Sequence, residues 1–280
     1  MMELLTADSL YAHVLMQRQT SQMIFAIFEG SDEDRLLTGH LNESDLTPLI
    51  GGGKAAVYGA GLLLHANRLK GAVAVIDRDL DDHLGISASY PPTIVATASY
   101  DLVGDVIRQR PELLMRTMSV HSTEAYAALS TGSGGRPMDL IYLVAMVLAP
   151  LRLVNEQRVL GLKLRKFPFE AVIQTDLTIP AIEDVLKIAN SRSGTIHDLE
   201  DMATDLVNAE VILTSKDCGG HDLLSVAAGL LRACGASGVS PKSLTIGLFS
   251  AVDSSVIKTL PVFEPLQKWA AEYSRRAFAF

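Results

Sequence analysis

The stretch AVAVIDRDLDD, Ala72 to Asp82, decides the fold. Its first five residues, Ala72–Ile76, are small or branched apolar residues, a pattern that predicts a fully buried strand. Four carboxylates follow within six positions, at Asp77, Asp79, Asp81 and Asp82. Because like charges at this spacing repel one another, we expect either a positive group among them or water between them.

The segments on both sides of this stretch alternate between strand and helix patterns. Met23–Phe28 is an unbroken apolar run that predicts a second buried strand, and it ends at Glu29-Gly30. The chain continues with a glycine loop, a helix opened by Lys54, and a later strand and helix, at 51–53, 55–70, 93–97 and 101–108. This alternation predicts an α/β fold with a parallel sheet flanked by helices.

The second half of the chain has mainly helical patterns. The predicted helices are 112–129, 139–148, one starting near Pro180, 195–210 and 219–235. The sequence therefore predicts two domains, a sheet-containing domain at 1–110 and a mainly helical C-terminal region at 111–280.

The composition describes an acidic, well-packed protein. The 280 residues are 48% apolar and 20% charged, which excludes global disorder, and the net charge is −8. Nucleic-acid binders usually carry a basic face, so this charge counts against tight autonomous binding. The most basic segment is RLVNEQRVLGLKLRKFPF, Arg152–Phe169, and its simplest interpretation is a solvated face.

Targeting signals are not apparent in the sequence. The most apolar run, Asp139–Val154, has about ten apolar residues before Pro150, whereas a bilayer needs roughly twenty, so we expect a buried helix and no membrane partner. A secretory signal pattern is missing, and the two cysteines, Cys218 and Cys234, form no disulfide framework. We therefore expect a cytoplasmic location.

The predicted sheet brings acidic residues to one edge. Ligands of parallel sheets bind at the carboxyl ends of the strands, and Glu29 and Asp77 each follow a strand. Along an extended strand end, Asp77 and Asp79 point to the same side and can face one Mg²⁺ or Mn²⁺ ion. Glu29 is a candidate metal ligand and general acid/base, and Asp81 or Asp82 can assist. The alternative is that these acids lie in solvated turns or cap helices.

Two further residues are candidates for the site. Lys54 follows three glycines at the start of a helix, a position that suits a substrate anion, although an ordinary surface lysine fits equally well. The GGGK segment lacks the spacing of a Walker A loop. His221 starts a helix and titrates near neutrality, so it is a candidate for proton transfer; the alternative is a packed histidine beside a capping Asp222.

These motifs together resemble a known family. FEGSDEDRLL at Phe28–Leu37 followed by VAVIDRDLDD at 73–82 resembles the TOPRIM fold of topoisomerases, primases, OLD-type nucleases and small ribonucleases. With the GGK segment at 52–54 and GHDLL at 220–224, the chain is more closely similar to the DUF4435 family of TOPRIM-like proteins. It departs from that family at Val103, where an acid is usual; Asp101 is kept, and Asp105 is a candidate substitute.

The resemblance implies a Mg²⁺-dependent nuclease that cleaves RNA rather than DNA, plausibly transfer RNA. Glu29 would be the general acid/base, with Asp77, Asp79 and Asp81 as metal ligands. It also implies a toxic effector of anti-phage defence, as in the PARIS system, which is controlled by an ABC-type ATPase partner and is a homodimer when active. Two alternatives stay open. One is a non-catalytic module docking on an ATPase, which the acidic charge and Val103 favour, and the other is an OLD-like DNA endonuclease.

Overall fold

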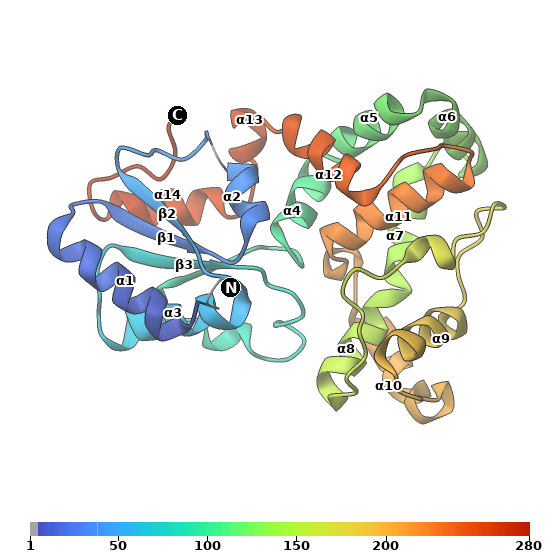
Figure 1. Ribbon diagram of the computed structural model, residues 1–280, viewed down its shortest axis with the longest axis horizontal. Helices are drawn as coiled ribbons and strands as arrows, with labels where there is room; N and C mark the ends of the chain where they lie inside the picture. The colour runs from blue at the N-terminus through green and yellow to red at the C-terminus, as the bar shows by residue number, and fades with distance from the viewer. Residues whose placement is uncertain (1–4, 38) are drawn as a thin grey trace. The chain divides into compact units, whose positions relative to one another are not determined.

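The computed structural model describes residues 5–37 and 39–280, which divide into two compact units. The first unit combines the chain up to Asp105 with Val252–Phe280, and the second is Val106–Ala251. The strands of the first unit are β1 (Ile24–Phe28), β2 (Leu46–Ile50), β3 (Ala72–Ile76) and β4 (Ile94–Ala96) (Figure 1). Its helices are α1 (Ala7–Thr20), α2 (Ser31–Leu37), α3 (Lys54–Ala66), η1 (Ser87–Ser89), α13 (Ser254–Ile257) and α14 (Phe263–Ala271).

The second unit is helical. The chain enters it through α4 (Leu102–Gln109), whose residues are shared between the two units. It then forms α5 (Pro111–His121), α6 (Thr123–Gly132), α7 (Pro137–Met146), α8 (Leu148–Arg158), η2 (Phe169–Ala171), α9 (Ile182–Ser193), α10 (Leu199–Ile212), η3 (Ser215–Asp217), α11 (Gly220–Ala233) and α12 (Pro241–Ser250).

A parallel sheet forms the centre of the first unit. Its order among the described residues is β2-β1-β3-β4, and every pairing is parallel, which confirms the predicted α/β class. Phe28 on β1 pairs with Val75 on β3, so these two strands end at the same edge. All five residues of β1 and of β3 are buried, as their continuous apolar runs predict.

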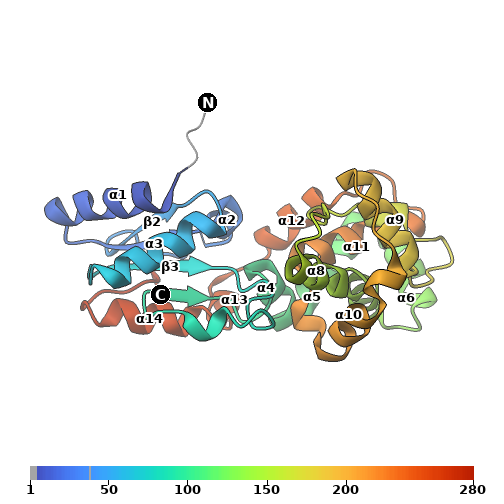
Figure 2. The same cartoon turned by 90° about the horizontal axis from the view of Figure 1, so that it is seen from below.

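One face of the sheet packs against α1 and α3, and Figure 2 shows α14 on the other side of the strands. Phe25 and Ile27 from β1 contact a cluster that includes Val14 of α1 and Leu64 of α3. Helix α3 approaches the sheet closely at Gly61, where an added Cβ would lie 2.6 Å from Ile94 Cγ1. The missing side chain at this position therefore lets α3 lie directly on β3 and β4.

The strand β2 has no clear signal in the sequence. It contains Pro48, which lacks a backbone N–H and is depleted in sheets. Among the residues that the structure describes, the strand lies at the edge of the sheet and pairs only with β1, so the missing donor leaves no gap inside the sheet.

The C-terminal segment returns to the sheet-containing unit, so the expected domain division at residue 110 is wrong for 252–280. The Asn42 amide donates to the Ala277 carbonyl (2.9 Å), and Leu41 forms a bridge with Phe278. Arg275 pairs with Asp45 at 3.0 Å. Phe278 is fully buried, and its ring lies 4.8 Å from that of Phe263 on α14.

Two expectations for the helical half are refined by the structure. The predicted helix 112–129 is two helices, because the Ser122 side chain accepts from the Ala125 amide and caps α6. The apolar run predicted as a buried helix forms α7 and the start of α8. By length and composition Pro137–Arg158 could cross a membrane, but its most apolar window is 61% buried within the protein, which is typical of a core helix.

A buried ion pair joins α8 to α11. Arg152 Nη2 lies 2.8 Å from Asp222 Oδ2 and also donates to the Leu164 carbonyl at 3.0 Å. Burial nevertheless raises the pKa of Asp222, and the nearby Arg152 opposes this only in part. Asp222 is therefore an ion-pair partner in the interior rather than the helix cap considered as an alternative.

We expect Phe278→Ala to lower the free energy of unfolding of the first unit by about 3–5 kcal/mol, because the variant leaves a cavity under α14. Trp269 on α14 is the single tryptophan of the chain, so its fluorescence during chemical denaturation reports on this unit. Phe280, whose side chain is 39% exposed, is the matched control, and Phe280→Ala should cost clearly less. Equal losses would contradict the proposed packing of the C-terminal segment.

We expect Arg152→Ala to destabilise the second unit by roughly 3–5 kcal/mol, because it leaves the Asp222 carboxylate buried without its partner. The double variant Arg152→Met/Asp222→Leu should lose less than the sum of the two single changes. Arg158→Ala removes an exposed pair with Asp205 and should cost less than about 1 kcal/mol. Circular dichroism during urea denaturation would measure all of these variants, and additive losses would contradict the coupling.

Candidate active site at the carboxyl edge of the sheet

Glu29 and Asp77 lie together where β1 and β3 end. Glu29 Oε1 accepts from the backbone amide of Asp77 at 2.8 Å. Asp77 Oδ1 in turn accepts from the amide of Leu102 at the start of α4, at 3.2 Å. The parallel pairing of the two strands therefore brings together two carboxyl groups that are 48 residues apart in the sequence, as predicted.

Burial makes both carboxyl groups hard to ionise. Burial raises the pKa of Glu29 to about 8. The hydrogen bond from the Asp77 amide favours the charged form and lowers this pKa, but by less than burial raises it. Burial also raises the pKa of Asp77 well above its ordinary value, and the negative charges of Asp101 and Glu33 add to this effect. Without a cation, these two groups hold protons at a pH at which ordinary carboxyl groups are ionised.

Lys54 is the positive group that the acidic stretch requires. Its Nζ lies 2.7 Å from Asp79 Oδ2 and 2.8 Å from Asp81 Oδ2, and it donates to the Arg78 carbonyl at 3.2 Å. Burial lowers the pKa of Lys54, but the ion pairs with Asp79 and Asp81 raise it by more. Tyr90 also donates its hydroxyl proton to Asp81, so this buried carboxylate has two partners.

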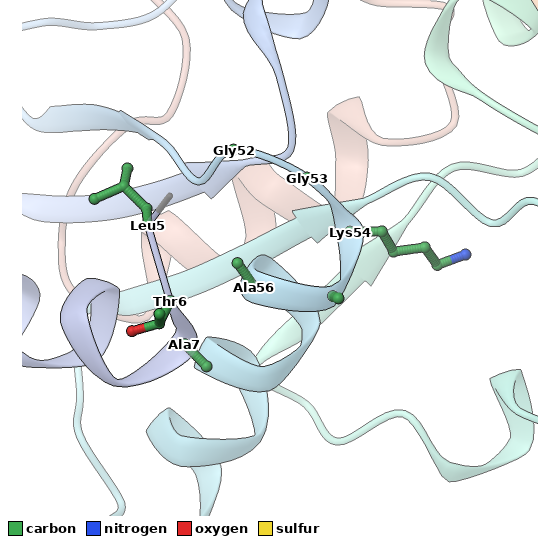
Figure 3. A pocket seen from close by; sticks show the side chains of 8 residues that line it. Leu5, Thr6, Ala7, Gly52, Gly53, Lys54 and Ala56 are labelled. Atoms are coloured by element: carbon green, nitrogen blue, oxygen red, sulfur yellow. The ribbon is translucent and has the colours of Figure 1, made fainter. Parts of the chain in front are cut away.

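The glycine loop before α3 places Lys54. Gly52 and Gly53 have φ values of 76° and 126°, a region that residues with a side chain rarely adopt, and the Gly53 amide donates to the Glu29 carbonyl at 2.8 Å. Figure 3 shows a hollow lined by Leu5–Ala7 and Gly52–Ala56 beside this loop, with the Lys54 side chain extending away from Leu5 and Thr6. The loop thus directs Lys54 toward the acidic stretch.

The chain after β3 is not extended, which corrects the expectation that Asp77 and Asp79 face one ion by strand alternation. Asp79 has a left-handed φ of 50°, and its amide donates to the Tyr100 carbonyl at 2.7 Å. Arg78 donates to the Thr97 carbonyl at 2.7 Å and pairs with Asp82 at 2.8 Å. The turn therefore gives Asp79 and Asp82 different cationic partners, Lys54 and Arg78, while the charge of Asp79 still raises the pKa of Asp77.

Of the four predicted metal ligands, Asp79 and Asp81 share the Lys54 ammonium, whereas Glu29 and Asp77 are linked through the Asp77 amide. The negative charge of Asp79 nevertheless acts on both Glu29 and Asp77 and raises the pKa of each. Within 5–37 and 39–280, no group of three or more histidine, cysteine, aspartate or glutamate side chains is placed to hold one ion. Mg²⁺, however, usually binds proteins through one or two carboxylates and keeps water or substrate phosphate as its other ligands. Glu29 and Asp77 fit that requirement, since a divalent ion would offset the cost of ionising both.

The acids near Val103 have structural partners. Asp101 Oδ1 accepts from the Gly104 amide at 2.6 Å, at the start of α4. Asp105 accepts from the amides of Ala98 and Ser99 and from the Ser99 hydroxyl, and it is buried. Asp105 therefore holds the loop between β4 and α4, and its role as a substitute for the acid missing at Val103 stays a prediction.

His221 belongs to the second unit, whereas Glu29 and Lys54 belong to the first. It is the second residue of α11 and is exposed, unlike the packed histidine considered as an alternative. Its role in proton transfer stays a prediction. Cys218, close to it in sequence, is buried, and burial raises the pKa of its thiol well above the ordinary value, so the thiol is neutral.

Sequence reasoning missed the supporting residues Tyr90 and Thr97. Thr97 follows β4, is buried, and its hydroxyl accepts from the Arg78 amide at 2.9 Å. Its place as the last residue of a third predicted strand, 93–97, was a usable signal, because strand ends gather at one sheet edge. Tyr90 lies in a turn-rich stretch, and no pattern in the sequence links it to Asp81.

No protein-family model, curated protein or solved structure matches this chain. The TOPRIM-like resemblance therefore depends on its motifs alone, and the function is inferred from the site.

Proposed function

We propose that this protein is a metal-dependent phosphodiesterase that cleaves nucleic acid, with Glu29 and Asp77 at its active site. The observation that carries the proposal is the direct contact of these two acids at the ends of neighbouring parallel strands, where the Asp77 amide donates to Glu29. Ligands of parallel sheets bind at this edge. Clusters of buried carboxyl groups with perturbed pKa values are also common at catalytic sites.

Glu29 is suited to proton transfer, because a pKa of about 8 lies near the pH of the cell. In phosphodiester hydrolysis, a new bond forms between water oxygen and phosphorus, and the bond to the leaving oxygen breaks. As a base, Glu29 accepts the proton of the attacking water; as an acid, it donates its own proton to the leaving oxygen. A Mg²⁺ ion, when bound, would supply charge stabilisation for the phosphoryl oxygens. Asp77 would hold that ion, and Glu29 would join it as a ligand in its ionised form.

The resemblance described from the motifs extends this proposal to a substrate and a setting. We propose RNA, and in particular transfer RNA, as the substrate, and a toxic effector of anti-phage defence as the biological role. An ABC-type ATPase would hold the effector inactive, and the active form would be a homodimer. DNA is the alternative substrate, as in OLD-like endonucleases.

A specific observation favours a second candidate, a non-catalytic module that docks on an ATPase. Lys54 already neutralises Asp79 and Asp81, two of the four acids that the family pattern assigns to metal. The pattern is also incomplete at Val103. In this case the acidic edge would be maintained for structure, and neither metal binding nor cleavage would occur.

We expect the stability of the protein to fall between pH 4.5 and about 8 because of Glu29. Over this range the folded chain keeps a proton on Glu29 that the unfolded chain releases, so a rising pH favours unfolding. Glu29→Gln removes this dependence and should stabilise the protein at pH 8, relative to pH 5, by more than about 1.4 kcal/mol, the equivalent of one pKa unit. Urea denaturation followed by Trp269 fluorescence measures it.

The exposed Glu264 of the same unit provides the control for this pH experiment. Glu264→Gln should leave the difference in the free energy of unfolding between pH 5 and pH 8 as it is in the unchanged protein. If the free energy of unfolding of Glu29→Gln changes with pH in the same way as that of the unchanged protein from pH 4.5 to about 8, Glu29 ionises normally.

We expect the unchanged chain, when expressed alone in bacteria, to arrest growth and to produce discrete RNA fragments. Glu29→Gln and Asp77→Asn should each reduce cleavage at least about 100-fold, because they remove the proton-transfer group and a metal ligand without changing side-chain volume. Total RNA and DNA separated on gels give the readout, and the purified protein should lose activity in EDTA.

Asp8→Asn, at an exposed position on α1, is the matched control for cleavage and should behave like the unchanged chain. Soluble, folded protein that leaves RNA and DNA intact with Mg²⁺ or Mn²⁺ would support the docking module instead. Fragmented DNA with intact RNA would point to the endonuclease alternative.

A further inference from the structure

The most basic segment of the chain contains two kinds of cation. Arg152 pairs with the buried Asp222, and Arg158 lies 3.4 Å from Asp205. No ion pair to Lys163, Arg165 or Lys166 is formed by any carboxylate in residues 5–37 and 39–280, and all three residues are exposed. The segment is therefore not a uniformly solvated face. Its first two cations are engaged in ion pairs, whereas its last three are exposed to solvent.

Residues 162–167, which we call the strap, combine buried apolar side chains with exposed cations. Leu162, Leu164 and Phe167 are 6%, 3% and 2% exposed, whereas the cations between them face solvent. The strap is a succession of turns, because the Leu164 amide donates to the Leu162 carbonyl at 3.2 Å and Lys166 has a left-handed φ of 52°. It thus presents three neighbouring positive charges to solvent.

The backbone of the strap is fixed by hydrogen bonds to neighbouring helices. The Lys163 amide donates to the Ser193 hydroxyl at 2.6 Å, and Arg192 Nη2 donates to the Arg165 carbonyl at 2.9 Å, both from the end of α9 (Figure 1). Arg152 holds the Leu164 carbonyl at 3.0 Å. The backbone is anchored while the side-chain charges of Lys163 and Arg165 stay available, and Arg192 adds another positive charge beside them.

We propose that the strap binds the phosphodiester backbone of a nucleic acid strand, and this inference rests on the proposed function. Protein interfaces have an apolar core, but the apolar residues of the strap are all buried, so it offers charge without apolar contact. Phosphates are bound in this way, through lysine and arginine charge. In a chain of net charge −8, an anchored group of exposed cations provides the local basic surface that a substrate strand requires.

The test measures binding separately from cleavage. Fluorescence anisotropy of a short labelled single-stranded RNA is recorded with the full chain carrying Glu29→Gln, so that cleavage cannot consume the probe. Lys163→Ala/Arg165→Ala should weaken binding at least about tenfold. It should also reduce the slope of the logarithm of the binding constant against the logarithm of the salt concentration by about 1.4, since each lost phosphate contact contributes about 0.7 on a single strand. Unlabelled single-stranded DNA as competitor shows whether the surface distinguishes the two backbones.

Arg116→Ala/Lys242→Ala is the matched control, because it removes one arginine and one lysine from exposed positions of the same unit. Both double variants should keep the thermal stability of the parent, since the strap is anchored by backbone atoms. Equal weakening in the two variants, absence of RNA binding in the parent, or equally strong competition by polyglutamate would overturn the proposal. RNA binding through the strap by a chain that cleaves nothing would support this inference and refute the nuclease.

Discussion

The parallel pairing of β1 with β3 is the interaction on which the rest of this structure depends. Both strands are buried along their whole length, so the chain can turn polar only where they end. Because the register places Phe28 beside Val75, Glu29 and Asp77 are forced to the same edge. Two acids held in this way cannot ionise freely, which is unfavourable for stability and useful for proton transfer.

The surrounding residues limit the electrostatic cost of that edge. Lys54 neutralises Asp79 and Asp81, and Arg78 pairs with Asp82. These contacts form because the glycine loop and the left-handed turn at Asp79 aim the side chains at one another. Glu29 and Asp77 are left with backbone amide donors, so ionisation stays unfavourable at the two residues best placed for chemistry.

The parts of this fold that the sequence predicted are those controlled by local patterns. The apolar runs of β1 and β3 and the acids after them were recognised, and with them the α/β class and the contact of Glu29 with Asp77. The edge strand β2 was missed because Pro48 is a poor strand residue, tolerated where one side of the strand has no partner. The turn at Asp79 depends on a single backbone angle, and the ion pairs of Lys54 depend on a tertiary approach, so neither leaves a periodic signal.

The return of residues 252–280 to the sheet has a consequence for synthesis of the protein. The second unit is an insertion between the sheet and the segment that completes it, so the four strands and then the helical unit are synthesised before that segment. The sheet acquires Phe278, α13 and α14 only after those residues leave the ribosome. A translation product interrupted before Val252 therefore lacks Phe278 and the part of the core that this segment forms.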